Sequence, residues 1–466
     1  MSTLRSSWLP PTVYPPPPPP SPHLNVGYVS SDFNNHPLAH LMQSVFGLHA
    51  PNRVRAFCYA TTSSDGSPHR KQIEREAPVF YDASSWSIEK LVNQIVEDNI
   101  HILVNLNGYT RGARNEVFAA RPAPIHMSFM GFAGTLGAEW CDYVFADTIS
   151  VPPSTLSPWR RNVDIEDRLH PDSLVEDAED WVYSENIIFA KASFFCCDHK
   201  QSAPDAKDGP PPLHDRRYRE IAWEDEQARR WKLRKEKFPN LSDDAVILGN
   251  FNQLYKIDPA TFRMYLRILS SIPNAILWLL RFPDLGEQNL LNFARNWASD
   301  SIASRIVFTD VAPKGEHIMR ASIVDLFLDT PECNAHTTAA DVVWSGTPIV
   351  TWGRWEYKMC SRMAGSILAS ALPLGPDGDR ARKDLIVTSE EQYENQAIEL
   401  ARGLIYSTVG TPGRGRGRLM DIRRMLWEGR WTSRLFDTKR WVRDLEKAYW
   451  EAWTKWERGD GGDIWL

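Results

Sequence analysis

Short apolar segments of strand length alternate with amphipathic helical segments along most of this 466-residue chain. "LNVGYVSSDF" predicts a strand and a loop, "HPLAHLMQSVFGLH" a helix, and "VRAFCYATT" a second strand. "SSWSIEKLVNQIVEDN" predicts an amphipathic helix with Leu91 and Ile95 in register, and "IHILVNLNGYT" a buried strand. The same alternation returns at residue 246 with "AVILGNF" and "DPATFRMYLRILSSIP". It indicates an α/β fold with parallel sheets covered by helices.

Two polar, proline-rich stretches interrupt this alternation, and the chain is too long for one ordinary core. Residues 1–23 contain "PPPPPPSP" and predict a disordered polyproline tail. Residues 151–245 predict a polar, partly disordered intervening segment. We therefore expect an N-terminal half over 24–150 and a C-terminal half over 246–466, which ends with a closing helix over about 436–457.

The overall composition excludes several classes of protein. A net charge of −6 and a pI of about 6.1 provide no basic field for binding nucleic acid. The sequence contains no apolar run of about 18 residues, so we expect no membrane span. The N-terminus does not match a secretory signal. The 6 cysteines are scattered without a C-x-x-C pair, which is typical of reduced thiols in an intracellular protein.

In "HPLAH", His36 and His40 lie four residues apart, so on a helix they would share a face. They could hold a metal, move a proton or pack. The motif lacks the glutamate of H-E-x-x-H and the sequence offers no obvious third ligand, which argues against zinc. His36, between a strand and a helix, is better placed as an acid, a base or a ligand contact. We expect His40 to pack in the apolar face of the helix.

Polar residues follow three strands of the second half. "FNQLYKIDP" places Gln253 and Lys256 between a strand and a helix, where a lysine can neutralise a phosphate. "VAPKGEH" supplies Lys314 and His317 at another strand end. Ligands of such sheets bind outside the carboxyl ends of the strands.

The third strand end, "TPECNAHTTAAD", opens a helix with His336, Thr337 and Thr338. The free N–H groups and the dipole of that helix favour an anion, and the hydroxyl groups add donors. Asp341 follows about one turn later and suits the hydroxyl groups of a ribose. Together the three strand ends predict a site for a phosphorylated, ribose-bearing ligand, although a solvated lysine and a threonine cap would explain the same residues taken singly.

Several long segments resemble the catalytic region of the protein O-GlcNAc transferase family. They include "VGYVSSDFNNHPLAHLMQS", "HILVNLNGYTRGARNEVFAARPAPI", "FNQLYKIDP", "LDTPECNAHTTAADVVWSGTPIVT" and "SRLFDTKRWVRDLEKAYWEAW". The resemblance covers about 24–150 and 246–457. It implies a GT-B glycosyltransferase with two Rossmann-like halves, UDP-GlcNAc in a cleft between them, and no cofactor. It also implies an inverting, metal-independent transfer of N-acetylglucosamine to Ser or Thr of cytoplasmic or nuclear proteins.

The resemblance also assigns roles to individual residues. His36 matches the family's active-site histidine beside the acceptor, and Lys256 matches a contact to the pyrophosphate. Asp98 and His101 fall in a segment that borders the site. The other matching positions are contacts to the donor: Gln253 to the sugar nucleotide, Ala312 and Lys314 to the uracil, His317 to Arg320 along the donor pocket, His336, Thr337 and Thr338 at the phosphate-binding helix start, and Asp341 to the ribose.

The sequence departs from the family's pattern in three places. A proline-rich tail precedes Leu24, where the family carries tetratricopeptide repeats that grip acceptor proteins. Ala339 stands where the family usually has glycine, and Trp352 and Trp355 lie in what is otherwise a smaller, glycine-containing loop. Two other functions stay open: a protein O-fucosyltransferase that uses GDP-fucose, and a catalytically silent binding or scaffold protein.

Overall fold

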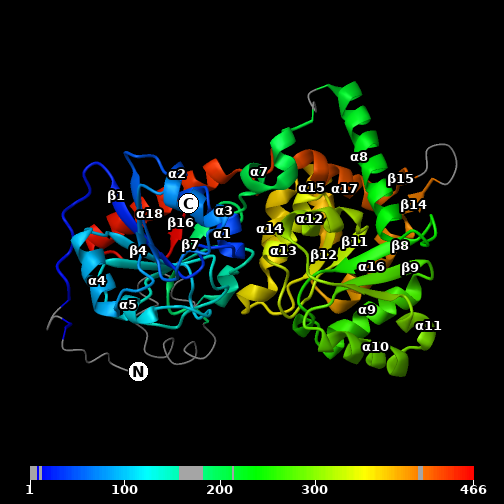
Figure 1. The fold of residues 1–466 in the computed structure, drawn as a ribbon, viewed down its shortest axis with the longest axis horizontal. Coiled ribbons are helices and arrows are strands. Elements are labelled where there is room, and N and C mark those ends of the chain that lie inside the picture. The colour runs from blue at the N-terminus through cyan, green and yellow to red at the C-terminus, as the bar shows by residue number, and fades with distance from the viewer. Residues whose placement is uncertain (1–7, 10–12, 157–181, 212–214, 408–412) are drawn as a thin grey trace, which may run out of the picture. The chain divides into compact units, whose positions relative to one another are not determined.

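The computed structural model describes residues 8–9, 13–156, 182–211, 215–407 and 413–466, which belong to two compact units. The first unit comprises residues 1–198 and 437–466, and the second comprises residues 199–436. Each unit is an α/β body built on a parallel sheet (Figure 1), which confirms the predicted fold class. The division differs from the predicted boundaries, because the residues predicted as one intervening segment are shared between the units and the C-terminal residues belong to the first.

In the first unit the described residues form an eight-stranded sheet in which every pair is parallel. The spatial order is β16-β7-β6-β5-β4-β1-β2-β3. The order therefore reverses between β1 and β4. The strands are β1 Leu24–Ser30, β2 Val54–Ala60, β3 Val79–Asp82, β4 Ile102–Asn105, β5 Ile125–Ser128, β6 Tyr143–Asp147, β7 Asn186–Ala190 and β16 Ile464–Trp465.

Side chains at the helix starts fix where several helices of the first unit begin. Ser67 caps α3 and is followed by Pro68, while the hydroxyl of Ser87 accepts a hydrogen bond from the backbone N–H of Lys90 at the start of α4. Both arrangements satisfy N–H groups that a helix leaves unpaired. Among the described residues, the helices of this unit are α1 Pro37–Met42, α2 Val45–Leu48, α3 Pro68–Glu76, α4 Ile88–Glu97, α5 Asn115–Ala119, the short 3₁₀ turn η1 Pro153–Thr155, and α18 Thr438–Arg458.

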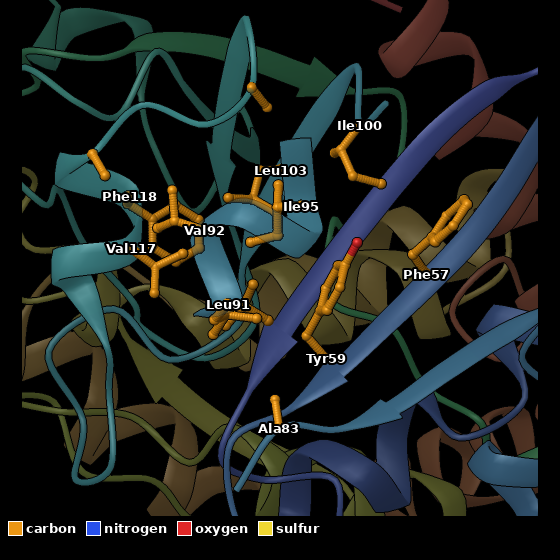
Figure 2. Close-up of a cluster of buried hydrophobic side chains, with 13 residues drawn as sticks. Phe57, Tyr59, Ala83, Leu91, Val92, Ile95, Ile100, Leu103, Val117 and Phe118 are labelled. Carbon is orange, nitrogen blue, oxygen red and sulfur yellow. The ribbon is translucent and has the colours of Figure 1, made fainter. Parts of the chain in front are cut away.

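The apolar face of α4 forms part of the core of the first unit (Figure 2). Leu91 and Ile95 are fully buried, as their helical register predicts, and they belong to the same cluster as Tyr59 of β2 and Leu103 of β4. Trp8, Leu9 and Tyr14 pack against this cluster from the N-terminal residues. The prediction of a disordered tail is therefore wrong for these three residues, because their aromatic and apolar side chains pack against the buried cluster of the first unit. Residues 1–7 and 10–12 lie outside the described residues.

The C-terminal helix α18 returns to the first unit, although about 240 residues of sequence separate it from the rest of that unit. Its Tyr449 hydroxyl donates to the Tyr28 hydroxyl of β1 at 3.0 Å, and Glu446 accepts from the backbone N–H of Ala50 at 2.7 Å. Figure 1 shows this helix in red among the blue elements of the first unit. The predicted closing helix therefore exists, but it completes the core of the N-terminal half.

In the second unit the described residues form a six-stranded parallel sheet with the order β10-β9-β8-β11-β12-β13. The order reverses between β8 and β11. The strands are β8 Val246–Asn250, β9 Ala275–Leu280, β10 Ile306–Thr309, β11 Leu326–Leu328, β12 Ile349–Trp352 and β13 Ile386–Val387, with a separate antiparallel pair, β14 Ile405–Tyr406 and β15 Gly415–Arg416.

Helices and short 3₁₀ turns connect these strands. Asp258 caps the helix that follows β8, and Pro259 is the first residue of that helix. The elements of this unit are α7 His199–Ser202, η4 Pro204–Asp208, α8 Arg216–Lys237, η5 Leu254–Lys256, α9 Pro259–Ser271, α10 Leu285–Trp297, α11 Asp300–Ala303, α12 Lys314–Ile323, α13 Thr337–Trp344, η6 Met359–Ser361, α14 Met363–Ala371, α15 Pro376–Leu385, α16 Glu390–Arg402 and α17 Arg418–Gly429.

Helix α8 lies where the sequence analysis expects a polar, partly disordered segment, and this expectation is wrong for residues 216–237. The buried face of α8 consists mostly of long polar side chains, so it produces no apolar stripe in the sequence. Arg234 donates to the buried Asp325 at 2.9 Å, and Arg230 contacts the same carboxylate at 3.4 Å. Ion pairs therefore replace apolar packing at this helix. No helix in the described part of the chain is long and apolar enough to cross a membrane.

Candidate functional site

The predicted ligand-binding residues of the second unit follow strands near the point where its sheet reverses order. Gln253 and Lys256 follow β8, and His336 to Asp341 follow β11, its direct neighbour. Ala312, Lys314 and His317 follow β10 at the edge of the same sheet. Ligands of open parallel sheets bind beyond the carboxyl ends of the strands at such a reversal.

Lys256 joins the loops that follow the two central strands. Its Nζ atom donates a hydrogen bond to the backbone oxygen of Asn334 at 3.0 Å. Asn252 donates to the Thr330 hydroxyl at 2.8 Å and so connects the same two loops. Gln253 is half-buried, and its backbone oxygen accepts from the N–H of Lys256 at 3.0 Å. The ammonium group is thus held beside the segment that leads into α13.

The start of α13 is open to an added anion. His336 occupies its N-cap position without capping the helix through its side chain, and its Nε2 lies 3.2 Å from the backbone oxygen of Cys360. Thr337 and Thr338 form the first helical positions and are half-buried. The N–H groups at a helix start carry partial positive charge, so this end of α13 favours a negatively charged group such as a phosphate.

Asp329, which sequence reasoning missed, shapes the loop in front of α13. Its buried carboxylate accepts from the backbone N–H of Ala335 and from the Thr351 hydroxyl, each at 2.7 Å. Burial raises the pKa of Asp329 to about 6, although both hydrogen bonds and the charge of Lys256 act to lower it. The sequence signal is its position as the first polar residue after the apolar strand "LFL".

Asp341 lies at the centre of a second cluster. His199 Nε2 donates to one carboxylate oxygen of Asp341 at 2.7 Å, and His317 Nε2 lies 3.6 Å from the other. Burial alone would raise the pKa of Asp341, but the hydrogen bond from His199 and the charges of His317 and Lys314 lower it. Asp341 is therefore a carboxylate at neutral pH, and it can accept hydrogen bonds from hydroxyl groups.

Sequence reasoning identified one of the two histidines beside Asp341, His317, and missed the other, His199. Burial lowers the pKa of both His199 and His317, so both rings are neutral near pH 7. His317 packs edge-on against Phe251 with 5.7 Å between ring centroids. Sequence reasoning missed His199 because it lies within the stretch predicted as an intervening segment; the signal is the apolar run "FFCC" directly before "DH".

Lys314 differs from the other members of this cluster in the environment of its charged group. It begins α12, its side chain is partly buried, and its Nζ atom has no hydrogen-bond partner among the described residues. A buried ammonium group without a partner is costly, and a ligand oxygen would supply one. Ala312 lies two residues earlier and is half-buried. Arg320 donates to the backbone oxygen of Asp310 at 2.6 Å and to the Glu316 carboxylate, and its charge helps to lower the pKa of His317.

The loop after β12 is tied to the loop after β11. Trp355 donates from its indole nitrogen to Glu332 at 2.7 Å, and Lys358 pairs with the same carboxylate. Arg354 lies over the rings of Trp352 and Trp355, at 5.8 and 5.1 Å from their centroids. The two tryptophans that depart from the family's pattern therefore take part in a bonded network beside the start of α13.

In the first unit, His36 follows β1, next to the reversal between β1 and β4. It caps α1: its Nδ1 accepts from the backbone N–H of Leu38 at 3.2 Å, and the same atom lies 3.7 Å from Asp32. Asn107, which follows β4, donates to Asp32 at 3.0 Å. About half of the His36 side chain is exposed (48%), which leaves its Nε2 edge open to a ligand.

His40 does not pack in the apolar face of α1 as expected. The buried residues of this helix are Leu38, Ala39, Leu41 and Met42, and His40 is only half-buried. Its Nε2 lies 2.8 Å from the Asn35 side-chain oxygen, and its ring centroid lies 4.1 Å from that of His69. Among the described residues, no group of three or more His, Cys, Asp or Glu side chains could hold a metal ion.

The structure does not bring Asp98 and His101 to the edge of the sheet that carries His36, and this corrects the prediction that they border the site. Both precede β4, at the amino ends of the parallel strands. Asp98 accepts from the hydroxyls of Tyr59 and Tyr81 at 2.6 and 3.2 Å. His101 is buried between the backbone of Asn25 and that of Pro18. Their contacts hold the first unit together.

Comparison with known proteins identifies the family. The model of glycosyl transferase family 41 matches residues 12–162 and 216–445. The chain is 39% identical over 431 residues to a probable UDP-N-acetylglucosamine–peptide N-acetylglucosaminyltransferase of Arabidopsis thaliana, and 33% identical over 499 aligned positions to the corresponding transferase of Caenorhabditis elegans. These alignments cover 92% and 94% of this chain but only 37% and 41% of the relatives.

A solved structure supports the fold. A mutant of the Thermobaculum terrenum O-GlcNAc transferase superposes with a TM-score of 0.70 at 21% identity, covering 96% of this chain and 71% of that one. The match agrees with the predicted GT-B type of two Rossmann-like halves. The family model, which covers most of the sequence, and the 39% identical relative together show that the chain belongs to glycosyl transferase family 41.

Proposed function

We propose that this chain transfers N-acetylglucosamine from UDP-GlcNAc to serine and threonine hydroxyl groups of intracellular proteins, with inversion at the sugar carbon and without a metal ion. The observation that carries the proposal is the set of cationic groups near the sheet reversal of the second unit: Lys256, the start of α13, and the unpartnered Lys314. The names of the curated relatives supply the sugar and the acceptor class.

The second unit would hold the donor. In this proposal Lys256 and the first N–H groups of α13 bind the diphosphate, because both offer positive charge at neighbouring strand ends. Asp341 accepts hydrogen bonds from the ribose hydroxyls. Lys314 and the flat, neutral ring of His317 bind the uracil, with Lys314 donating to a carbonyl oxygen and so gaining the partner that it lacks.

In this proposal, residues of the chain itself supply the positive charge that stabilises the leaving UDP. The acceptor oxygen forms a bond to the sugar's anomeric carbon on the face opposite the diphosphate, and the bond from that carbon to the diphosphate oxygen breaks. The electron pair leaves with UDP, and the hydroxyl proton passes to solvent or to the departing diphosphate. Lys256 and the α13 start stabilise the added charge on UDP, which is where fixed donors contribute most to catalysis.

His36 suits the task of orienting the acceptor hydroxyl. Because its Nδ1 accepts from the Leu38 N–H, the neutral ring carries its proton on Nε2. The exposed edge therefore donates a hydrogen bond to the acceptor oxygen and does not take its proton. Asp32, at 3.7 Å from Nδ1, would favour the other tautomer, in which Nε2 could act as a base. The shorter contact favours the orienting role.

Nucleotide binding separates this proposal from the two other functions. We expect UDP at a hundredfold excess over its Kd to stabilise the protein by about 2.7 kcal/mol in a thermal unfolding assay, because it binds only the folded state. GDP should have little effect, and Lys314→Ala should remove most of the UDP effect. Lys232→Ala, at an exposed position on α8, is the matched control. Preference for GDP would support fucosyl transfer, and no response to either nucleotide would support a silent scaffold.

A further inference from the structure

Two of the six cysteines differ from the others in position and exposure. Cys58, Cys141, Cys196 and Cys197 are buried, whereas Cys333 and Cys360 are partly exposed, and none of these six described residues is joined in a disulfide. Cys333 lies between β11 and α13, and Cys360 lies in η6 after β12. Since β11 and β12 are adjacent parallel strands, both cysteines lie beyond the same edge of the second sheet.

The backbone holds these two residues side by side. The N–H of Asn334, in the peptide unit that follows Cys333, donates at 2.8 Å to the carbonyl oxygen of Cys360. The Asn334 side chain fixes this contact further, because it donates to the Thr330 oxygen at 2.9 Å and accepts from the N–H of Ala364 at 3.3 Å. The two thiols hydrogen-bond to each other. The pair is therefore arranged before any reaction takes place.

The surroundings of the pair shift the pKa values of its two thiols in opposite directions. The hydrogen bond from the Cys360 thiol lowers the pKa of Cys333 well below its usual value, with His336 and Lys256 acting in the same direction against the effect of burial. The hydrogen bond to Cys333, together with burial, raises the pKa of Cys360. Cys333 is thus a thiolate at neutral pH, whereas Cys360 keeps its proton. A thiolate is the form that attacks disulfides and electrophiles.

We propose that Cys333 and Cys360 form a reversible disulfide by exchange with a low-molecular-weight disulfide such as oxidised glutathione. The Cys333 thiolate attacks one glutathione sulfur, forms a mixed disulfide and releases the other glutathione as a thiolate, which takes the proton of Cys360. The Cys360 sulfur then attacks the Cys333 sulfur and releases the second glutathione. The two cysteines lose two electrons and one oxidised glutathione gains them.

A ligand in the neighbouring site should change the reactivity of the thiol pair, and this expectation rests on the proposed function. Lys256 contacts the residue after Cys333, and His336 contacts the backbone of Cys360. A diphosphate bound by Lys256 would repel the Cys333 thiolate and shield it. Because the rate of thiol–disulfide exchange depends on the thiolate fraction and on access to the thiolate, we expect saturating UDP to slow disulfide formation about tenfold.

The experiment treats the intact chain with oxidised glutathione, blocks the remaining thiols and maps every cysteine by mass spectrometry. The wild-type protein should give one cross-link between Cys333 and Cys360, and the four buried cysteines serve as internal controls. Cys360→Ser should accumulate a glutathione adduct on Cys333, whereas Cys333→Ser should leave Cys360 free. A wild-type protein without the cross-link, or Cys360 modified in Cys333→Ser as readily as Cys333 in Cys360→Ser, would overturn the proposal.

A second measurement needs no variant. In the wild-type protein, alkylation of Cys333 should keep its rate between about pH 7 and pH 5, whereas ordinary thiols slow about tenfold per unit as they gain protons. A tenfold loss per unit at Cys333 would contradict its role as the attacking thiolate. If the cross-link forms at the same rate with and without UDP, the thiol pair stands and the placement of the diphosphate beside it is wrong.

Discussion

His36 is a helix cap and also the proposed contact to the acceptor hydroxyl, and mutation to alanine would remove both at once. It caps α1 through Nδ1 and presents its Nε2 edge to a ligand, so replacement by alanine removes both a cap and a candidate catalytic group. Asp341 likewise has more than one contact, because one of its carboxylate oxygens accepts from His199 at 2.7 Å and the other lies 3.6 Å from His317. Single residues of this chain therefore need substitutions that separate structure from chemistry.

For His36 the informative substitution is asparagine. Asparagine is among the best N-cap residues, so His36→Asn should keep the free energy of unfolding within a few tenths of a kcal/mol, whereas His36→Ala should cost about 1 kcal/mol. Both should lower peptide glycosylation about a hundredfold, because neither carries the imidazole Nε2–H that orients the acceptor hydroxyl. Denaturant unfolding and initial rates give the two readouts. Normal turnover in His36→Asn would show that the histidine is only a cap.

Asp329 predicts a pH dependence of stability with a defined sign. Its pKa is raised to about 6 in the folded state, above the ordinary value of 3.8, so the folded state binds the proton more tightly. The stabilisation from this proton is complete below about pH 4 and is lost as the pH rises through about 6. Asp329→Asn should remove this dependence, so the stability of the wild type relative to the variant should fall by about 1 kcal/mol from pH 5 to pH 7. A pH-independent difference in urea unfolding would contradict the assignment.

At the scale of elements, α8 shows how charged side chains can anchor a helix without an apolar stripe. Arg230 and Arg234 reach Asp325, whose carboxylate also accepts from the N–H of Ile247 in β8 at 2.8 Å. Burial would raise the pKa of Asp325, but the two arginines and this hydrogen bond lower it. The carboxylate thus joins α8 and the strands β8 and β11, which also position the candidate donor site.

Truncating one partner of this buried cluster should be costly. Arg234→Ala leaves Asp325 with fewer charged partners in the interior, and we expect a loss of about 3–5 kcal/mol in the free energy of unfolding. Lys232→Ala on the same helix removes an exposed pair with Glu236 and should cost less than about 0.5 kcal/mol. Urea unfolding of the two variants tests the contrast. Equal effects would mean that Asp325 does not hold α8 in place.

At the scale of the whole molecule, the alternation of strands and helices was enough to predict two parallel-sheet halves. It also placed Lys256 and His336 at strand ends, because polar residues directly after apolar strands are visible in a sequence; that these two strands are neighbours came only from the structure. The course of α18 was not visible, since its apolar face does not show which sheet it covers. His199 was missed for a related reason, because its partner Asp341 lies 142 residues away.

The error over Asp98 and His101 has a different origin. Similarity to a family locates a segment, but it does not tell which end of the strand a residue occupies. Both residues precede β4, and the carboxyl end of that strand carries Asn107 instead. The helix α8 was not predicted, because most of its buried side chains are charged or polar and leave no apolar stripe in the sequence. Pattern-based prediction thus identified elements whose burial is apolar and failed at α8, where ion pairs replace apolar packing.

The proposed chemistry of the whole molecule also predicts its response to chelators. If Lys256 and the α13 start neutralise the diphosphate, then EDTA should leave peptide glycosylation within about twofold of the untreated rate. The measurement compares initial rates after dialysis against EDTA with and without added Mg²⁺, Mn²⁺ or Zn²⁺. A loss of activity that one of these ions restores would show that a metal carries the charge of the leaving group.

Sugar transfer from UDP-GlcNAc is the function that we propose for the cationic site on the second unit. The direct measurement follows labelled N-acetylglucosamine from UDP-GlcNAc to a serine-containing peptide, with the wild type, Lys256→Ala and the control Lys232→Ala. Wild type and control should transfer the sugar equally, and Lys256→Ala should lose a hundredfold to a thousandfold, the effect of removing one such charge-stabilising contact, about 3–4 kcal/mol. Transfer by folded Lys256→Ala at the wild-type rate, or no transfer by the wild type, would contradict the account.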